Sequence, residues 1–157
     1  MTDKMHSTAL IKDLPVRNTT IYPPVLAKEI KGRSNVALGN IFGLTQFGAN
    51  ITTLEPGAWS SHRHAHAEED ELLVALEGEM VIVDNHGRHP FRSGMVAGFK
   101  AGDGNAHKVV NETDKPVKFL VVGTRSETET VHYADVDMKG VKTAGNFVVT
   151  RKDGSTF

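Results

Sequence analysis

The chain of 157 residues contains no cysteine. This absence excludes a disulfide framework, a thiolate nucleophile, a zinc finger and an iron–sulfur cluster, so His, Asp or Glu must hold any bound metal. The apolar runs are only a few residues long, far below the roughly 20 that span a bilayer. A basic excess is also missing, because 18 Lys and Arg are balanced by 19 Asp and Glu. We therefore expect neither a membrane nor a nucleic acid as a partner.

The first residues lack the apolar core of a signal peptide, because the acidic Asp3 and Asp13 flank only a short apolar cluster at 9–11. We therefore expect a cytoplasmic protein. With 39% hydrophobic and 24% charged residues, the composition is that of one ordinary globular domain. No segment offers the two capped, amphipathic helices of a helix-turn-helix, which argues against a DNA-binding regulator.

Strand patterns begin at Ala37. From there, short runs of Val, Ile, Phe, Leu and Thr are separated by Gly, Asn and Asp at intervals of about 8–12 residues, a spacing typical of sandwiches and barrels, so the predicted fold class is all-β. Apolar residues occupy the odd positions of 47–51, which predicts a strand with one buried face. The runs 72–76 and 80–83 flank a turn-like Glu-Gly-Glu and predict a hairpin. Further strands are predicted at 118–122 and 147–150.

The most informative stretch is a histidine-rich segment at 57–71. Side chains at positions i and i+2 of a strand point to the same face, so His64 and His66 can direct two imidazoles at one point and chelate a metal. His62 is in phase with both, so the choice of pair stays open. A His-x-His motif alone is a weak signal, because chance alone yields about half an occurrence at this histidine content. The alternative is a polar, partly exposed strand.

Acidic residues follow these histidines. His66 and Glu71 are an odd number of positions apart, so a continuous strand would place them on opposite faces. The chain must therefore turn or bulge between them if Glu71 is a third ligand. Asp70 would then point outward or support the ligands from behind. Glu68 and Glu69 are candidates for acid–base chemistry only if this turn carries them inward.

A second segment, at 94–111, combines a strand pattern, a glycine-rich turn and another strand that begins at a histidine. Together the two segments resemble the two conserved motifs of the cupin superfamily. The first motif has Gly, His-x-His, Glu after four intervening residues and Gly after six more. The second has Gly, a Pro-x-Gly turn, and then His with Asn four residues later. The matching residues here are Gly57, His64, His66, Glu71 and Gly78 in the first motif and Gly94, Gly102, His107 and Asn111 in the second.

The match departs from the family in the second motif. Lys100 occupies the usual place of Pro, and the turn before the histidine is longer than the minimal pattern. Both departures affect the expected shape of the pocket rim more than the ligands. Segments 43–47 and 121–125 also resemble small, single-domain bacterial cupins of mostly unassigned function. The resemblance covers residues 35–135.

This resemblance implies a double-stranded β-helix, a jelly-roll barrel of two facing sheets with an open mouth. The chain would then comprise an N-terminal arm or edge strands at 1–36, the barrel at 37–135, and a C-terminal extension at 136–157 that packs on the barrel. One divalent ion per chain, Mn, Fe, Ni or Zn, would lie inside. Its ligands would be His64, His66, Glu71 and His107.

Such a site leaves positions on the ion open for a substrate. The resemblance therefore implies a metal-dependent enzyme acting on a small oxygen-rich molecule, a sugar derivative or a hydroxy or keto acid, by isomerisation, dioxygenation or related chemistry. Cupins use nearly the same ligands for all of these reactions, so the reaction type stays open. The alternatives are a non-catalytic module that binds or senses a small molecule through the same metal, and a purely structural jelly roll. By analogy with similar domains, we also expect a homodimer.

Other side chains give weaker signals. Lys100, Arg63 and Arg125 are candidate positive charges near the barrel mouth for an anionic substrate, although such residues are more often solvated surface. Phe99 is expected in the core rather than against a substrate. Asn111 is expected to fix a turn or strand end by side-chain hydrogen bonds and not to bind the metal.

Overall fold

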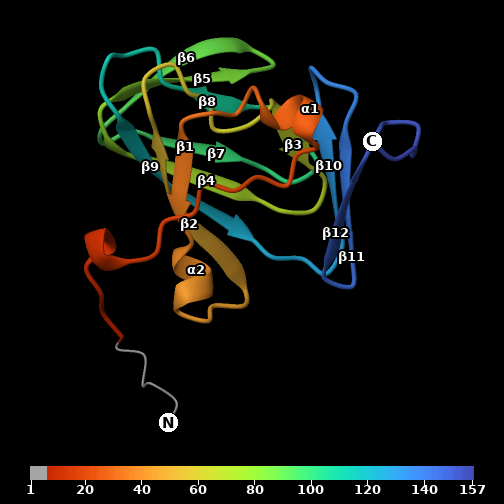
Figure 1. Ribbon diagram of the computed structural model, residues 1–157, viewed down its shortest axis with the longest axis horizontal. Coiled ribbons are helices and arrows are strands. Elements are labelled where there is room, and N and C mark those ends of the chain that lie inside the picture. Colours follow the sequence, from red (N-terminus) through yellow and green to blue (C-terminus); the bar gives the residue numbers. More distant parts are fainter. Residues whose placement is uncertain (1–6) are drawn as a thin grey trace.

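Strands dominate the computed structural model, which describes residues 7–157 (Figure 1). This confirms the predicted all-β fold. The helical elements are short: a 3-10 turn at Ile11–Asp13, α1 (Pro24–Ala27) and α2 (Leu38–Ile41). The strands are β1 (Arg33–Val36), β2 (Phe47–Leu54), β3 (His64–His66), β4 (Glu71–Glu77), β5 (Glu79–Asp84), β6 (Gly87–Arg92), β7 (Val96–Phe99), β8 (Lys108–Val110), β9 (Val117–Thr124), β10 (Glu129–Tyr133), β11 (Lys139–Thr143) and β12 (Asn146–Thr150).

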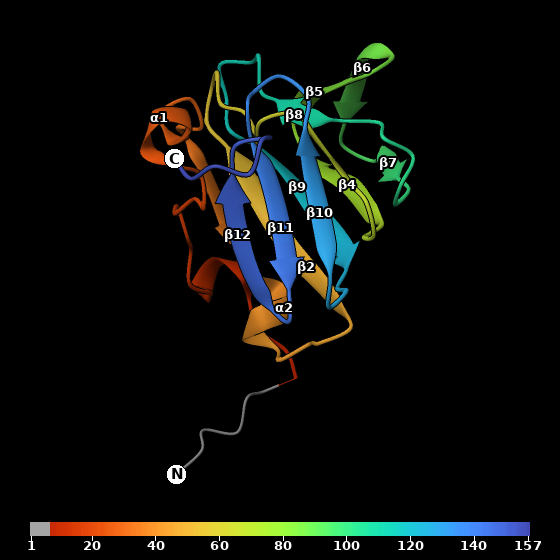
Figure 2. The ribbon, with the colours of Figure 1, turned by 90° about the vertical axis from the view of Figure 1, so that its right-hand side faces the viewer.

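The strands form two layers. A five-stranded antiparallel sheet has the order β1-β2-β9-β4-β7, and two smaller sheets have the orders β12-β11-β10-β3 and β6-β5-β8. The smaller sheets are joined where His64 and His107 exchange two backbone hydrogen bonds of 3.1 and 2.9 Å. Figure 2 shows β10, β11 and β12 in front of the larger sheet. This arrangement is the jelly-roll barrel that the resemblance implied.

Apolar side chains from both layers fill one part of the barrel. Leu54, Leu73 and Phe119 of the large sheet pack with residues such as Ile82 and Phe91 of the opposite layer, and each is at most 5% exposed. Burying a side chain of this size stabilises the fold by about 1.5–3 kcal/mol. The barrel therefore has a packed core on which a polar cavity can be built.

The predicted hairpin of 72–76 and 80–83 is wrong. Although β4 and β5 are consecutive, β4 pairs with β7 and β9, and β5 pairs with β6 and β8. Gly78 is the joint where the chain passes from one layer to the other, with a φ of 85°. A Cβ at this glycine would lie 2.6 Å from Cγ1 of Val117, so no side chain fits. A tight Gly-containing turn in a sequence does not distinguish a hairpin from such a crossing.

Strand β2 differs from the predicted strand with one buried face. Ala49 and Ile51 are buried as expected, whereas Phe47, the first apolar position of the pattern, is 40% exposed. The polar positions Asn50 and Thr52, however, line the barrel cavity. Both faces of this strand are therefore covered, and the polar one faces the interior.

Residues 22–26 and the C-terminal strands pack together on one flank of the barrel. Tyr22, Leu26 and Val149 pack against the buried Tyr133 and Met138, and Figure 2 shows the C-terminus beside α1. Within residues 7–157, no helix is both long and apolar enough to cross a membrane. The three-part division of the chain, the cytoplasmic location and the homodimer stay predictions.

Candidate metal centre

Three histidines gather on the inner face of the smaller layer. His64 and His107 are directly opposite each other in the bridge that joins the two small sheets, and opposed residues share a face. His66 lies two positions further along β3, on that same face. The ring centroid of His64 lies 5.0 Å from that of His66 and 5.1 Å from that of His107. Strand pairing alone therefore brings these three predicted ligands together.

Glu71 reaches the same point from the opposite layer. The chain leaves β3, turns, and enters β4 in the five-stranded sheet at Glu71, which is the turn that the odd spacing required. One ligand atom each from His64, His66 and Glu71 lies within 4.8 Å of the others. Oε2 of Glu71 lies 2.6 Å from Nε2 of His107. All four predicted ligands thus converge.

His62 is not part of this group, although the sequence left it in phase. The strand begins only at His64, so the alternation does not extend back to His62. Its Nε2 lies 3.1 Å from the carbonyl oxygen of Leu26, and its ring lies 5.1 Å from that of Tyr22. His62 therefore fastens the N-terminal segment to the barrel.

The electrostatics of the cluster favour a neutral His64 and an ionised Glu71. Burial, and after it the neighbouring His107, lower the pKa of His64 from 6.5 to about 4. Burial alone would raise the pKa of Glu71, but the hydrogen bond and charge of His107 outweigh it and bring that pKa to about 2. Neutral imidazole and ionised carboxylate are the forms that bind a metal.

The donor set fits a divalent transition metal. Nδ1 of His64 lies 3.0 Å from the carbonyl oxygen of His62, and Nδ1 of His107 lies 3.4 Å from that of Asn105. When each Nδ1–H donates to its carbonyl, the Nε2 lone pair is left for an ion. Three imidazole nitrogens and one carboxylate suit Mn, Fe, Ni or Zn.

A cavity of about 640 Å³ adjoins these ligands. Its volume suits a small organic molecule. Phe99 is buried in the core as predicted, and its ring also stacks on His107, with centroids 3.4 Å apart and planes 9° apart. The polar and charged side chains around the cavity include Arg33, Asn35, Asn50, Thr52, Ser60, Ser61, Glu69, Glu129 and Lys142.

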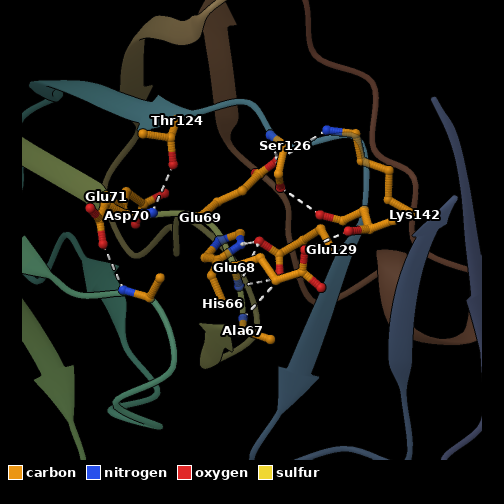
Figure 3. A network of polar contacts seen from close by, with 12 residues as sticks. His66, Ala67, Glu68, Glu69, Asp70, Glu71, Thr124, Ser126, Glu129 and Lys142 are labelled. Carbon is orange, nitrogen blue, oxygen red and sulfur yellow. Dashed lines mark hydrogen bonds and ion pairs between the residues drawn. The ribbon is translucent and has the colours of Figure 1, made fainter. Parts of the chain in front are cut away.

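The turn between β3 and β4 separates two adjacent glutamates (Figure 3). Glu68 is exposed and accepts a hydrogen bond from Oγ1 of Thr128. Glu69 is turned inward, lines the cavity and is 18% exposed. Its Oε1 accepts hydrogen bonds from Nζ of Lys142 at 3.0 Å and from the backbone N–H of Ser126 at 3.0 Å. Of the two acid–base candidates, only Glu69 meets the condition set by the sequence.

Three other residues for which the sequence predicted a role are Asn111, Arg63 and Lys100. Asn111 is fully buried and donates to the carbonyl oxygens of Leu54 and Lys115, so it fixes the end of β8, as predicted. Arg63 is paired with Asp135 at 2.8 Å and does not line the main cavity. The exposed Lys100 does not line it either.

Arg125 lines a second hollow of about 370 Å³. This hollow also contains Arg17 and Lys142, and it shares Asn50 and Glu71 with the main cavity. Three cationic side chains therefore lie beside the ligand cluster. Sequence reasoning missed Arg17 and Lys142, because nothing in their local sequence distinguishes them from surface charges.

The fold and the four converging ligand types are those of a cupin. The Cupin domain family matches residues 50–123, a range that contains all four. A search of curated proteins found no significant match. Among solved structures, the chain is 47% identical to a sugar phosphate isomerase of the cupin superfamily from Silicibacter pomeroyi DSS-3, with a TM-score of 0.91 and 96% of each chain covered. The chain belongs to the cupin superfamily.

More distant structures share the fold alone. A putative sugar phosphate isomerase from Acidithiobacillus ferrooxidans is 22% identical with a TM-score of 0.72, covering 87% of this chain and 95% of the other. The polyketide cyclase RemF from Streptomyces resistomycificus is 21% identical with a TM-score of 0.63, covering 76% and 80%. At this distance the chemistry differs between neighbours, so it must be argued from the site.

Proposed function

We propose that this protein is a metal-dependent isomerase that interconverts the aldose and ketose forms of a small phosphorylated sugar. The observation that carries the proposal is the convergence of His64, His66, Glu71 and His107 beside a cavity of about 640 Å³. The 47% identity to a protein described as a sugar phosphate isomerase supports this choice among cupin reactions. These four residues would hold a divalent ion, which would supply Lewis acidity toward adjacent hydroxyl and carbonyl oxygens of the substrate.

Glu69 is the proposed proton carrier. Isomerisation moves one proton from C2 to C1 while the hydroxyl proton of O2 passes to O1, so a base must face both carbons. The hydrogen bonds that Glu69 accepts from Ser126 and Lys142 all end on Oε1, which leaves Oε2 free of them. In this proposal Oε2 takes the C2 proton and returns it to C1, a type of transfer worth about 100- to 10,000-fold in rate.

The cations of the adjoining hollow favour an anionic end on the substrate. Arg125 and Lys142 line it together with Arg17, and a phosphate group is bound well by Arg side chains with free N–H groups. The guanidinium of Arg125 already donates to the carbonyl oxygen of Leu44 at 2.7 Å, which holds it in place. A phosphate in this hollow would leave the sugar carbons beside the shared residues Asn50 and Glu71.

The test is a metal assay followed by a substrate panel. Untagged protein purified without chelator is analysed for metal, and then incubated in D2O with phosphorylated and unphosphorylated aldoses and ketoses. We expect about one transition metal per chain, turnover of a phosphorylated sugar only, and deuterium at the exchanged carbon. Undiminished turnover after complete chelation would contradict the proposal. Tight binding of a sugar phosphate that remains chemically unchanged would instead favour the non-catalytic binding module.

A further inference from the structure

One of the three clustered histidines differs from the others at Nδ1. His64 and His107 have backbone carbonyl oxygens facing this atom, at 3.0 and 3.4 Å. Nδ1 of His66 is buried, and within residues 7–157 it has no hydrogen-bond partner. A buried N–H without a partner costs about 1–3 kcal/mol, so its surroundings call for an explanation.

The group that faces Nδ1 of His66 is a buried carboxylate. Oε2 of Glu129 lies 3.5 Å from this nitrogen, and Glu129 is only 2% exposed (Figure 3). Glu129 begins β10, whose Val131 is paired in register with His66 of β3. The pairing of these two strands therefore places the carboxylate beside the ring.

The same carboxylate also holds the turn that leads to Glu71. Oε1 of Glu129 accepts the backbone N–H of Ala67 at 2.8 Å and that of Glu68 at 3.1 Å. These two bonds fix Glu129 against the end of β3. Oε1 is thus occupied by backbone, and Oε2 faces both Nδ1 of His66 at 3.5 Å and the backbone N–H of Glu68 at 3.4 Å.

We propose that Glu129 is a positioning residue for the metal centre. With an ion bound, its Oε2 accepts a hydrogen bond from Nδ1–H of His66, which fixes the tautomer of His66 and leaves its Nε2 for the ion beside His64 and Glu71. A carboxylate behind a ligating histidine also raises the basicity of the ring. The inference rests on the metal site of the proposed function and extends it to a residue outside the cupin motifs.

A second ion between His66, Glu69 and Glu129 is the competing explanation, since their ligand atoms also lie within 4.8 Å of one another. Two observations weigh against it. The ammonium of Lys142 already lies 3.0 Å from Oε1 of Glu69, and Oε1 of Glu129 is occupied by two backbone N–H groups. The positive charge that such a cluster needs is therefore supplied by the chain.

The test compares Glu129→Gln with Glu68→Gln in the full chain. A glutamine at 129 can still accept the backbone N–H groups of the turn, but its neutral amide is a weaker partner for Nδ1–H. Glu68 belongs to the same turn and points to solvent, so its variant is a matched control. Zinc affinity is measured by competition with a chelator, and thermal unfolding is recorded for each variant without metal. We expect zinc binding about 10- to 100-fold weaker for Glu129→Gln and unchanged for Glu68→Gln.

Nitrogen NMR of the zinc-loaded protein with labelled histidine supplies a second readout, which a merely structural role would not change. We expect His66 to be protonated at Nδ1 and bound through Nε2 in the parent, with the Nδ1–H signal shifted in Glu129→Gln. Equal zinc affinity of Glu129→Gln and the parent, binding through Nδ1, or two zinc ions per chain would each overturn the inference. If the parent itself binds no metal, the proposed function fails first, whereas a metal-binding parent with an indifferent Glu129 refutes the inference alone.

Discussion

The cavity has two polar walls that differ in how they are built. One wall carries His64, His66 and His107 on strand segments whose residue types and spacing are those of metal ligands. The other carries Glu129 and Lys142 on β10 and β11, in a stretch without any such motif. The first wall is defined by local sequence, whereas the second is defined by which strands become neighbours. The sequence motif thus defines the histidines that can bind a metal, and the pairing of the strands defines the residues that surround them.

We expect the largest effect, on metal binding, from removing histidines of the first wall. In the double variant His64→Ala, His107→Ala two imidazoles are lost, and we expect metal affinity to fall by at least about 1000-fold. Elemental analysis after dialysis checks this. The matched control is His62→Ala, which removes a nearby histidine that contacts Leu26 instead of the cluster. It should keep its metal even if its stability falls, and equal metal loss in both variants would contradict the assignment of the site.

The next effect distinguishes the two adjacent glutamates. Glu69→Gln keeps the shape of the cavity but removes the proposed base, so we expect kcat to fall about 100-fold or more with the metal content unchanged. Glu68→Gln changes the exposed neighbour in the same way and should leave kcat within a factor of two or so of the parent. Steady-state kinetics on the substrate found in the panel measures both. Similar kcat values for the two variants would exclude Glu69 as the proton carrier.

The contrast between the walls also explains what could be predicted from the sequence. The convergence of His64, His66, Glu71 and His107 was predictable because these four residues match a family motif. The inward direction of Glu69 was not, because an odd spacing shows that a turn exists but not which of its side chains the turn buries. The crossing at Gly78 was mistaken for a hairpin for a similar reason: both need a glycine, and only the partner strands differ. Glu129 depends on the pairing of β3 with β10, which no local pattern encodes.

A residue of the second motif that supports the fold and not the metal gives an intermediate effect. Asn111→Ala leaves the carbonyl oxygens of Leu54 and Lys115 without their buried donor, so we expect the free energy of unfolding to fall by about 2 kcal/mol. Asn146 is exposed on β12, and Asn146→Ala should change it by less than about 0.5 kcal/mol. Urea titration measures both. If Asn111→Ala instead lost its metal at unchanged stability, this asparagine would support metal binding together with the three histidines of the first wall.

The smallest effect concerns two arginines that the sequence could not distinguish. Arg125 lines the hollow beside the ligand cluster and packs over Gly39 and Gly48, where a Cβ would lie 3.4 and 3.7 Å from its guanidinium nitrogens. Arg63 is occupied by Asp135 and Asn85 at the surface. We expect Arg125→Met to raise KM for a phosphorylated substrate about 10-fold, the value of one hydrogen bond to a charged group. Arg63→Met should leave KM unchanged and cost less than about 1 kcal/mol of stability, because exposed ion pairs contribute little. A rise in KM for Arg63→Met instead would contradict the placement of the anionic end of the substrate beside Arg125.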